Sequence, residues 1–162
     1  MRINRATVLA APIEDVWAIV TDPERVLGYM SGVTRWEVAG DRAIGLGARY
    51  RMLFRVGAAE VGGVVEVVEF DEPCDFAWTS VTGLDHRGRW RLREVPGGRT
   101  RIELRLAYVV EGAGLSGWVA ERVAAPTVSG HVRRTLEQLA RLVEHEQLRA
   151  AAANRRRASA RD

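Results

Sequence analysis

The chain has 162 residues, of which 47% are hydrophobic and 28% charged, and its formal net charge is +3. This composition is typical of a single soluble globular domain. No apolar run approaches the ~18 residues that a membrane-spanning helix needs, and Cys74 is the single cysteine, which excludes an internal disulfide. We therefore expect a cytoplasmic protein without a secretory signal or a membrane span.

The basic residues are all arginine, and they are unevenly distributed. Residues 149–162 contain five arginines against one aspartate, so residues 1–148 are nearly neutral. We predict a domain over residues 1–148 followed by a basic, disordered tail over residues 149–162. A solvated tail is favoured over one that touches nucleic acid or anionic lipid, since no aromatic residue lies among these arginines to stack on bases. The absence of lysine excludes Schiff-base chemistry.

The first elements expected are one strand and two short helices. Residues 2–10 are interpreted as the strand. Pro12 suits the first turn of a helix, where the negative charge of Glu14 complements the helix dipole. Asp22 can cap a second, shorter helix that ends at Gly28.

Six further strands follow, separated by turns. Apolar and polar residues alternate within them, which is typical of half-buried strands. The arginines near the end of this run fall on one parity, which predicts a solvated outer face rather than a polyanion-binding stripe. Gly62 and Gly63 predict a bulge or a sharp bend. The strands are expected at residues 33–38, 49–56, 61–70, 76–81, 87–93 and 99–108.

A long helix over residues 115–148 is expected to close the domain. Its apolar residues recur at steps of three, four or seven on one side. Pro126 removes a hydrogen bond within it and clashes with the preceding turn, which predicts a kink or a break. Small residues around this point, including Ala125 and Ser129, would leave space between the helix and the sheet.

The chain resembles the helix-grip family of START-like (SRPBCC) proteins, in particular its polyketide cyclase/dehydrase and lipid-transport branch. The similarity extends over about residues 2–148, and its motifs serve helix starts, a turn and helix packing rather than chemistry. The residues that carry it are 11–17 with 21–24, 67–73 with 76–78, and 134–139.

The resemblance implies an α+β fold in which a curved, seven-stranded antiparallel sheet wraps around a long C-terminal helix. It also implies a mostly apolar internal cavity. Members bind lipids, polyketides and other hydrophobic molecules, and a few catalyse cyclisation and dehydration. Those cyclases place an arginine with tyrosine, tryptophan or serine neighbours inside the cavity. Here most strand arginines have the outer parity, so no catalytic arginine is assigned.

Aromatic and thioether side chains with the inward parity are the candidate ligand-binding residues, because pockets for hydrophobic ligands have such walls. The alternative is that these side chains fill the core and leave no pocket. The candidates are Tyr50, Met52, Phe54, Trp78, Ser80, Trp90 and Tyr108 from the strands, with Ala125 and Ser129 from the last helix.

Candidate catalytic groups are few. Asp85 and His86 are adjacent, and an aspartate can orient an imidazole for acid–base work. A polar surface turn is the favoured interpretation of this pair. His131 lies one residue from the buried side of the last helix, where packing is favoured over a position at the cavity rim. No His or Cys spacing indicates a metal site, no glycine-rich phosphate loop is present, and no cofactor is expected.

Three functions remain open at this stage. The first is a carrier or binding protein for a hydrophobic small molecule, such as a lipid or polyketide. The second is an enzyme of the polyketide cyclase/dehydrase type that uses the same cavity; a buried arginine, histidine or carboxylate facing the cavity would favour it. The third is a protein-interaction module without a ligand. We expect no specific nucleic-acid partner, and a monomer and a homodimer are both compatible with the sequence.

Overall fold

Seven antiparallel strands form one sheet in the order β1-β7-β6-β5-β4-β3-β2. The computed structural model describes residues 1–109 and 115–160, without the side chains of residues 115–124. The strands are β1 (Arg2–Leu9), β2 (Val33–Val38), β3 (Arg49–Val56), β4 (Ala59–Asp71), β5 (Asp75–Ser80), β6 (His86–Val95) and β7 (Arg99–Tyr108). The order follows from short hairpins between neighbours from β2 to β7, with β1 added at the edge beside β7.

Three helices complete the domain: α1 (Ile13–Val20), α2 (Val26–Tyr29) and α3 (Leu115–Ser159). Pro12 directly precedes α1, whose first turn carries Glu14 and Asp15 as the helix dipole favours. Asp22 accepts a hydrogen bond from the backbone N–H of Glu24 at 2.9 Å and so orders the turn before α2.

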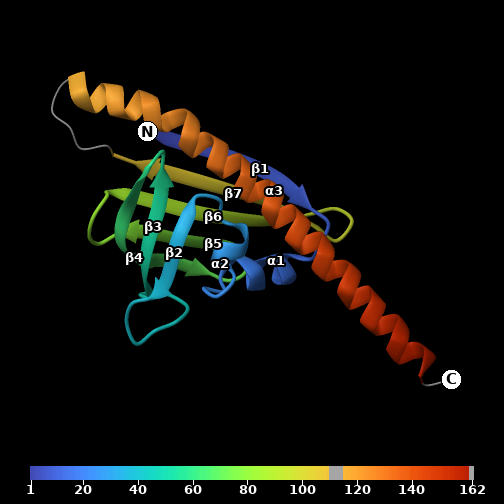
Figure 1. Cartoon of the computed structure of the whole chain (residues 1–162). Coiled ribbons are helices and arrows are strands. Elements are labelled where there is room, and N and C mark those ends of the chain that lie inside the picture. The colour runs from blue at the N-terminus through green and yellow to red at the C-terminus, as the bar shows by residue number, and fades with distance from the viewer. Residues whose placement is uncertain (110–114, 161–162) are drawn as a thin grey trace.

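The long helix α3 crosses the concave side of the curved sheet (Figure 1) and contacts β1, β3 and α2. Its buried side carries Val132, Leu136, Leu139 and Val143 at helical spacing. These residues pack with the inward side chains of the strands into a single core. The predicted α+β helix-grip fold is therefore confirmed.

The helix agrees with the prediction of a kink or a break near Pro126, where it bends without breaking, but it extends further than predicted. Pro126 lies inside α3 without breaking it, and Figure 1 shows that the first turns of α3 run at an angle to the rest. The helix also continues to Ser159, so the predicted disordered tail beyond residue 148 is helical in the structure up to that residue. Alanine and arginine are strong helix formers, and residues 149–158 consist of these two types except for Asn154.

The expected irregularity at Gly62 and Gly63 is also displaced. The pairing of β3 with β4 runs through both glycines without a shift, whereas the pairing of β4 with β5 shifts between Val67 and Glu69. The glycines serve another purpose, which is close approach of neighbouring backbone. A Cβ atom on Gly62 would lie 2.1 Å from the carbonyl oxygen of Met52, and one on Gly63 would lie 2.0 Å from that of Thr82.

On the arginine-rich face of the sheet, two buried carboxylates, Asp75 and Glu103, accept hydrogen bonds from neighbouring arginines. Asp75 accepts hydrogen bonds from Arg93 at 2.7 Å and from Arg91 at 3.1 Å. Burial alone would raise the pKa of Asp75, but these hydrogen bonds outweigh it and the pKa lies below its usual value. Glu103 accepts hydrogen bonds from Arg105 and Arg101 in the same way. The arginines therefore pair within the sheet, in line with their predicted outer parity.

Candidate functional site

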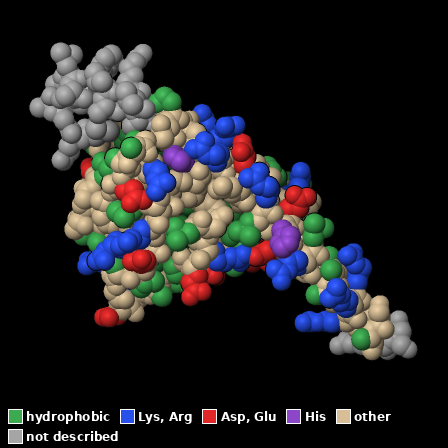
Figure 2. All heavy atoms as spheres, in the orientation of Figure 1, with side chains coloured by type: hydrophobic (Ala, Val, Ile, Leu, Met, Phe, Trp, Pro, Cys, Tyr) green, Lys and Arg blue, Asp and Glu red, His purple; other side chains and the backbone are tan. Residues whose placement is uncertain are grey.

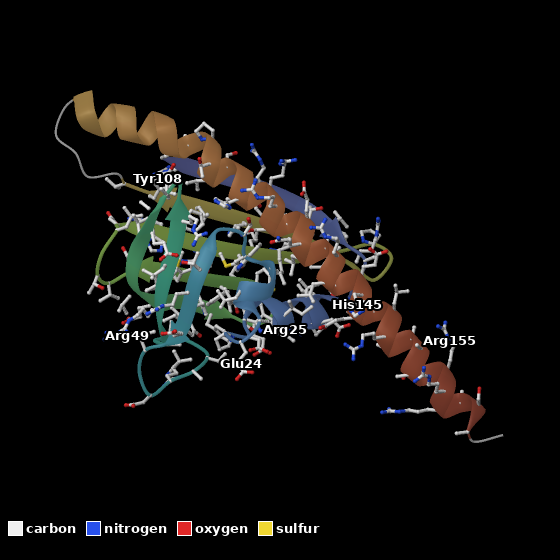
Figure 3. The ribbon with its side chains drawn as sticks, in the orientation of Figure 1. Glu24, Arg25, Arg49, Tyr108, His145 and Arg155 are labelled. Carbon is white, nitrogen blue, oxygen red and sulfur yellow. The ribbon has the colours of Figure 1, made fainter. Side chains whose placement is uncertain are left out.

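An apolar pocket of about 250 Å³ lies at one end of the concave side of the sheet, next to α3. Its walls come from β3, the end of β7, the start of β4, the turn before β6 with the first residue of β6, the residue after α2, and one residue of α3. Figure 3 shows Tyr108 at the end of β7 that lies nearest the first turns of α3. The residues that line the pocket are Met30, Met52, Phe54, Val56, Ala59, Val61, Gly62, Leu84, His86, Leu106, Ala107, Tyr108 and Val128.

Glycines bring two chain segments, β4 and the turn between β5 and β6, close together beside this pocket. A Cβ atom on Gly83 would lie 1.9 Å from the carbonyl oxygen of Gly62, which itself lines the pocket. The backbone N–H of Leu84 points to the same carbonyl oxygen at 3.4 Å. The turn between β5 and β6 can therefore pack directly on β4 and place Leu84 and His86 in the pocket wall.

His86 is a buried ionisable side chain among the described lining residues. Only 7% of the residue is exposed. Its Nδ1 atom lies 2.9 Å from the carbonyl oxygen of Leu84, and its backbone N–H donates to Ser80 Oγ at 3.1 Å. Burial lowers the pKa of His86, against smaller opposing contributions from the Leu84 hydrogen bond and from Asp85. The imidazole is therefore neutral at pH 7.

The hydrogen bond at Nδ1 fixes the tautomer of His86. A carbonyl oxygen can only accept, so Nδ1 must carry the proton that it donates to Leu84. In the neutral ring Nε2 then holds a lone pair. Nε2 is buried and has no hydrogen-bond partner among the described residues. The buried His86 side chain thus contains one acceptor that nothing in the described chain satisfies.

Three of the predicted ligand-binding residues meet at this pocket, namely Met52, Phe54 and Tyr108. Tyr108 is 8% exposed, and its hydroxyl donates to Met1 Sδ at 3.0 Å. Val128 of α3 lies in the same pocket wall, and the ring of Phe54 also contacts His131 of α3. Their role in binding stays a prediction.

The larger aromatic candidates lie elsewhere, in the filled part of the core. Tyr50, Trp78 and Trp90 are at most 2% exposed and do not line the pocket. The Tyr50 ring stacks on Trp36 with centroids 4.8 Å apart, and its hydroxyl donates to the carbonyl oxygen of Ala43 at 2.7 Å. Burial raises the pKa of Tyr50 to about 12.

Ser80 and Asp85 are brought together with His86, but not as an acid–base pair. Asp85 is exposed, and its Oδ1 atom lies 3.4 Å from Ser80 Oγ. The imidazole Nδ1–H of His86 donates its hydrogen bond to the carbonyl oxygen of Leu84 rather than to the Asp85 carboxylate. Ser80 and Asp85 therefore order the turn that carries His86.

On α3, the pocket is lined by Val128 rather than by the predicted Ala125 and Ser129, which are half-buried and lie outside the lining. Val128 was part of the apolar side recognised in the sequence. Residues at the tip of the β3–β4 hairpin and in the turn before β6, such as Val56, Val61 and Leu84, were not identified. His86 has the same parity as Gly88 and Trp90, and in a strand this parity predicts that its side chain points toward the core.

A small polar cluster lies behind Phe54. The His131 ring packs against Phe54 with centroids 5.2 Å apart, and its Nδ1 atom lies 2.9 Å from Ser31 Oγ and 3.0 Å from Arg134 Nη2. Burial lowers the pKa of His131, and the charge of Arg134 lowers it further. His131 is half-buried and does not line the pocket, so its contacts agree with the packing interpretation.

A second depression of about 770 Å³ lies on the arginine-rich face of the sheet. Unlike the first pocket, it is lined by several charged side chains. Two of its arginines are already paired, Arg89 with Glu69 and Arg105 with Glu103. The described residues contain no group of three or more metal-ligating side chains. Within the same part of the chain, none of the helices has the length and hydrophobicity needed to cross a bilayer.

Comparison with solved structures identifies the same architecture in several bacterial proteins. TTHA0849 from Thermus thermophilus is 22% identical, with a TM-score of 0.77 over 90% of this chain and 99% of that protein. The Zhui aromatase/cyclase of a Streptomyces species is 18% identical, with a TM-score of 0.75 over 89% and 93%. A START superfamily protein of Mycobacterium smegmatis is 14% identical, with a TM-score of 0.71 over 89% and 97%. At these identities the likeness establishes the fold alone.

No curated protein matches the sequence. The family model described as "Polyketide cyclase / dehydrase and lipid transport" matches residues 1–144, which is nearly the whole region that the sheet and α3 occupy. The chain therefore belongs to the polyketide cyclase/dehydrase and lipid-transport family.

Proposed function

We propose that the protein binds an apolar small molecule in the pocket beside α3 and acts as a carrier or binding protein. The observation that carries the proposal is the pocket itself, which is lined by aliphatic, aromatic and thioether side chains with one histidine. A pocket of this kind, with few polar groups, is typical of sites for hydrophobic ligands. Family membership is consistent with this function.

The polarity of the walls argues that water is a poor occupant. A buried water needs two to four polar partners, and apolar cavities of about 150 Å³ can stay dry and bind benzene. The pocket here has a volume of about 250 Å³, and among its described side chains His86 Nε2 is the one unsatisfied polar atom. An apolar ligand would gain roughly 25 cal/mol for each Å² removed from water, before the costs of association.

A pocket-filling substitution tests the proposal. N-phenyl-1-naphthylamine, an uncharged apolar fluorophore, is titrated into the purified protein and into Val128→Trp, which places an indole ring in the pocket. We expect the wild type to bind the probe with enhanced fluorescence and Val128→Trp to bind it at least tenfold more weakly. Leu148→Trp is the matched control, because Leu148 is 62% exposed on the same helix and lies outside the pocket.

Native mass spectrometry of the protein as purified gives the second measurement. A co-purifying hydrophobic molecule that is lost in Val128→Trp supports the proposal. If the wild type binds neither the probe nor a co-purifying molecule, or if Val128→Trp binds as well as the wild type, then the pocket is not a binding site. A protein-interaction module would then be the better interpretation.

A cyclase or dehydrase of the polyketide type is the second candidate, and one observation favours it. His86 places a neutral imidazole in the pocket wall, and an imidazole can act as a general base. The described lining residues include no arginine and no carboxylate that could act as the complementary acid. The mostly apolar lining therefore favours binding or transport of a ligand over catalysis.

A further inference from the structure

We propose that the arginine-rich face of the sheet binds a small phosphate-bearing molecule between Arg2 and Arg87. The site is the second depression, which has a volume of about 770 Å³ and crosses β1, β7, β6, β5 and β4. It is separate from the proposed function of the apolar pocket, because the side chains of these arginines lie on the other face of the sheet. The observation that carries the proposal is that the two arginines lack the carboxylate partners that their neighbours have.

The strand register places both arginines in one row of outward side chains. Arg2 lies opposite Ala107 on β7, and Ala107 lies opposite Arg87 on β6. Thr79 of β5 continues the row, opposite Arg87. Two strand spacings, roughly 10 Å, therefore separate the backbones of Arg2 and Arg87, with the small side chain of Ala107 between them. Both arginines are exposed, so their long side chains can reach one group that lies above Ala107.

The charges of the depression do not balance. Its lining contains four arginines against one carboxylate, that of Glu69. Two of the arginines form ion pairs, one with Glu69 and one with Glu103. Arg2 and Arg87 form no ion pair with any carboxylate of the described chain. An anion bound between them would supply the missing counter-charge and offset the repulsion between the two guanidinium groups.

A phosphate group fits this arrangement better than a carboxylate does. The guanidinium fork matches phosphate oxygens in a bidentate manner. A phosphate monoester carries nearly two negative charges at neutral pH, so one compact group can neutralise both arginines, whereas one carboxylate neutralises one. Thr79 also lines the depression, and its hydroxyl can donate a hydrogen bond to a phosphate oxygen.

The organic part of the ligand should contribute little to recognition. Trp78 is among the lining residues, but it is 1% exposed, so its ring cannot stack on an aromatic ring of the ligand. Ala77 and Ala107 offer only small apolar side chains in the same depression. We therefore expect the site to recognise the phosphate group and to show no preference for a nucleobase.

The test is a titration with glycerol 3-phosphate, followed by calorimetry and by the amide ¹⁵N and ¹H shifts of Arg87. Succinate, which also carries two negative charges, and uncharged glycerol are the comparison ligands. The variants are Arg2→Gln, Arg87→Gln and the double variant. Arg51→Gln is the matched control, because Arg51 is an exposed arginine on the same face that forms no ion pair within the described chain and lies outside the depression.

We expect glycerol 3-phosphate to bind the wild type, with glycerol not binding and succinate binding more weakly. Each single variant should weaken binding about fivefold, the size expected of an ion pair exposed to solvent, and the double variant should abolish it. Arg51→Gln should stay within about twofold, because salt screens distant charges. Binding of N-phenyl-1-naphthylamine should be unchanged in every variant, so the result is independent of the proposed function.

Three results would overturn the proposal. The first is no binding of glycerol 3-phosphate to the wild type. The second is an equal loss of affinity in Arg51→Gln and Arg87→Gln, which would indicate a diffuse positive field rather than a site. The third is tighter binding of succinate, of a glutamate-rich peptide or of a single-stranded oligonucleotide at the same arginines, which would assign the face to a different class of partner.

Discussion

Gly88 on β6 should be one of the least substitutable positions of the chain. A Cβ atom there would lie 2.1 Å from Cζ2 and 2.4 Å from Cε2 of Trp78, the residue directly opposite on β5. The indole cannot move away, because Trp78 is 1% exposed and its ring contacts those of Phe76 and Trp36, with centroids 5.5 Å and 6.2 Å away. A single methyl group therefore overfills this part of the core.

For Gly88→Ala we expect the free energy of unfolding to fall by about 3 kcal/mol, the upper end of the usual range for overpacking. For a domain of this size that corresponds to a decrease of roughly 6–12 °C in the melting temperature. The assay is urea denaturation followed by tryptophan fluorescence and circular dichroism. The control is Gly130→Ala on α3, where the nearest side-chain atom to the new Cβ is Arg134 Nη1 at 3.4 Å. That substitution should stabilise by up to about 1 kcal/mol through helix propensity.

The Trp78→Phe background separates a steric clash from a general intolerance of alanine in the strand. Phenylalanine lacks the benzo ring atoms that the new methyl group would meet. In the double variant the loss should therefore be smaller than the sum of the two single losses by at least about 1 kcal/mol. Strict additivity, or a loss below about 1 kcal/mol in Gly88→Ala alone, would refute the steric argument.

Three further outcomes are expected from other contacts. Glu103→Gln should destabilise the protein by about 1–3 kcal/mol at neutral pH, because charge-assisted hydrogen bonds from Arg105 and Arg101 are lost. The hydrogen bond from Arg105 is the main cause that lowers the Glu103 pKa from 4.5 to about 2. The wild type should therefore lose this stability as the pH falls from about 4.5 to 2, whereas the variant should not, and acid titration of the unfolding midpoint measures the difference. Tyr50→Phe removes the hydrogen bond to Ala43 and should lower the free energy of unfolding in urea by about 1 kcal/mol. It should not change probe binding, because Tyr50 does not line the pocket; weaker probe binding would show that Tyr50 belongs to the ligand site. Deleting residues 149–162 should change the melting temperature by less than about 2 °C, because nearly all described residues of this segment are exposed. A change of about 2 °C corresponds to roughly 1 kcal/mol in a domain of this size. A larger decrease would show that the folded domain includes residues beyond 148.

The sequence was sufficient for the fold because alternation and turn residues act locally. The period of two in residues 99–108 predicted β7 with the bounds Arg99–Tyr108, and the helical spacing of Val132, Leu136 and Leu139 predicted the buried side of α3. The family motifs added the order of these elements. The end of α3 could not be placed, because alanine and arginine favour a helix whether or not it packs on anything.

The position of the pocket could not be predicted from parity. Trp90 and Tyr108 both point inward, yet Trp90 is 0% exposed in the filled core while Tyr108 lines the pocket. What separates them is their position along the strands, because Trp90 lies in the middle of β6 whereas Tyr108 is the last residue of β7. His86 is a predicted candidate, but as part of a polar turn after the fifth strand. In the structure β6 begins at this residue and gives it the inward parity of Gly88 and Trp90.

The extension of α3 beyond the sheet has a practical consequence. Figure 2 shows basic side chains along this projecting end, and Figure 3 shows Arg155 directed away from the rest of the protein. From Val128 to Ser159 the helix advances about 45 Å at 1.5 Å per residue. A reporter dye or a surface tether attached near Ser159 would therefore sit far from the pocket mouth. Immobilisation through this end, on a sensor chip or a bead, leaves the pocket open to dissolved ligands and makes kinetic measurements of their entry and release straightforward.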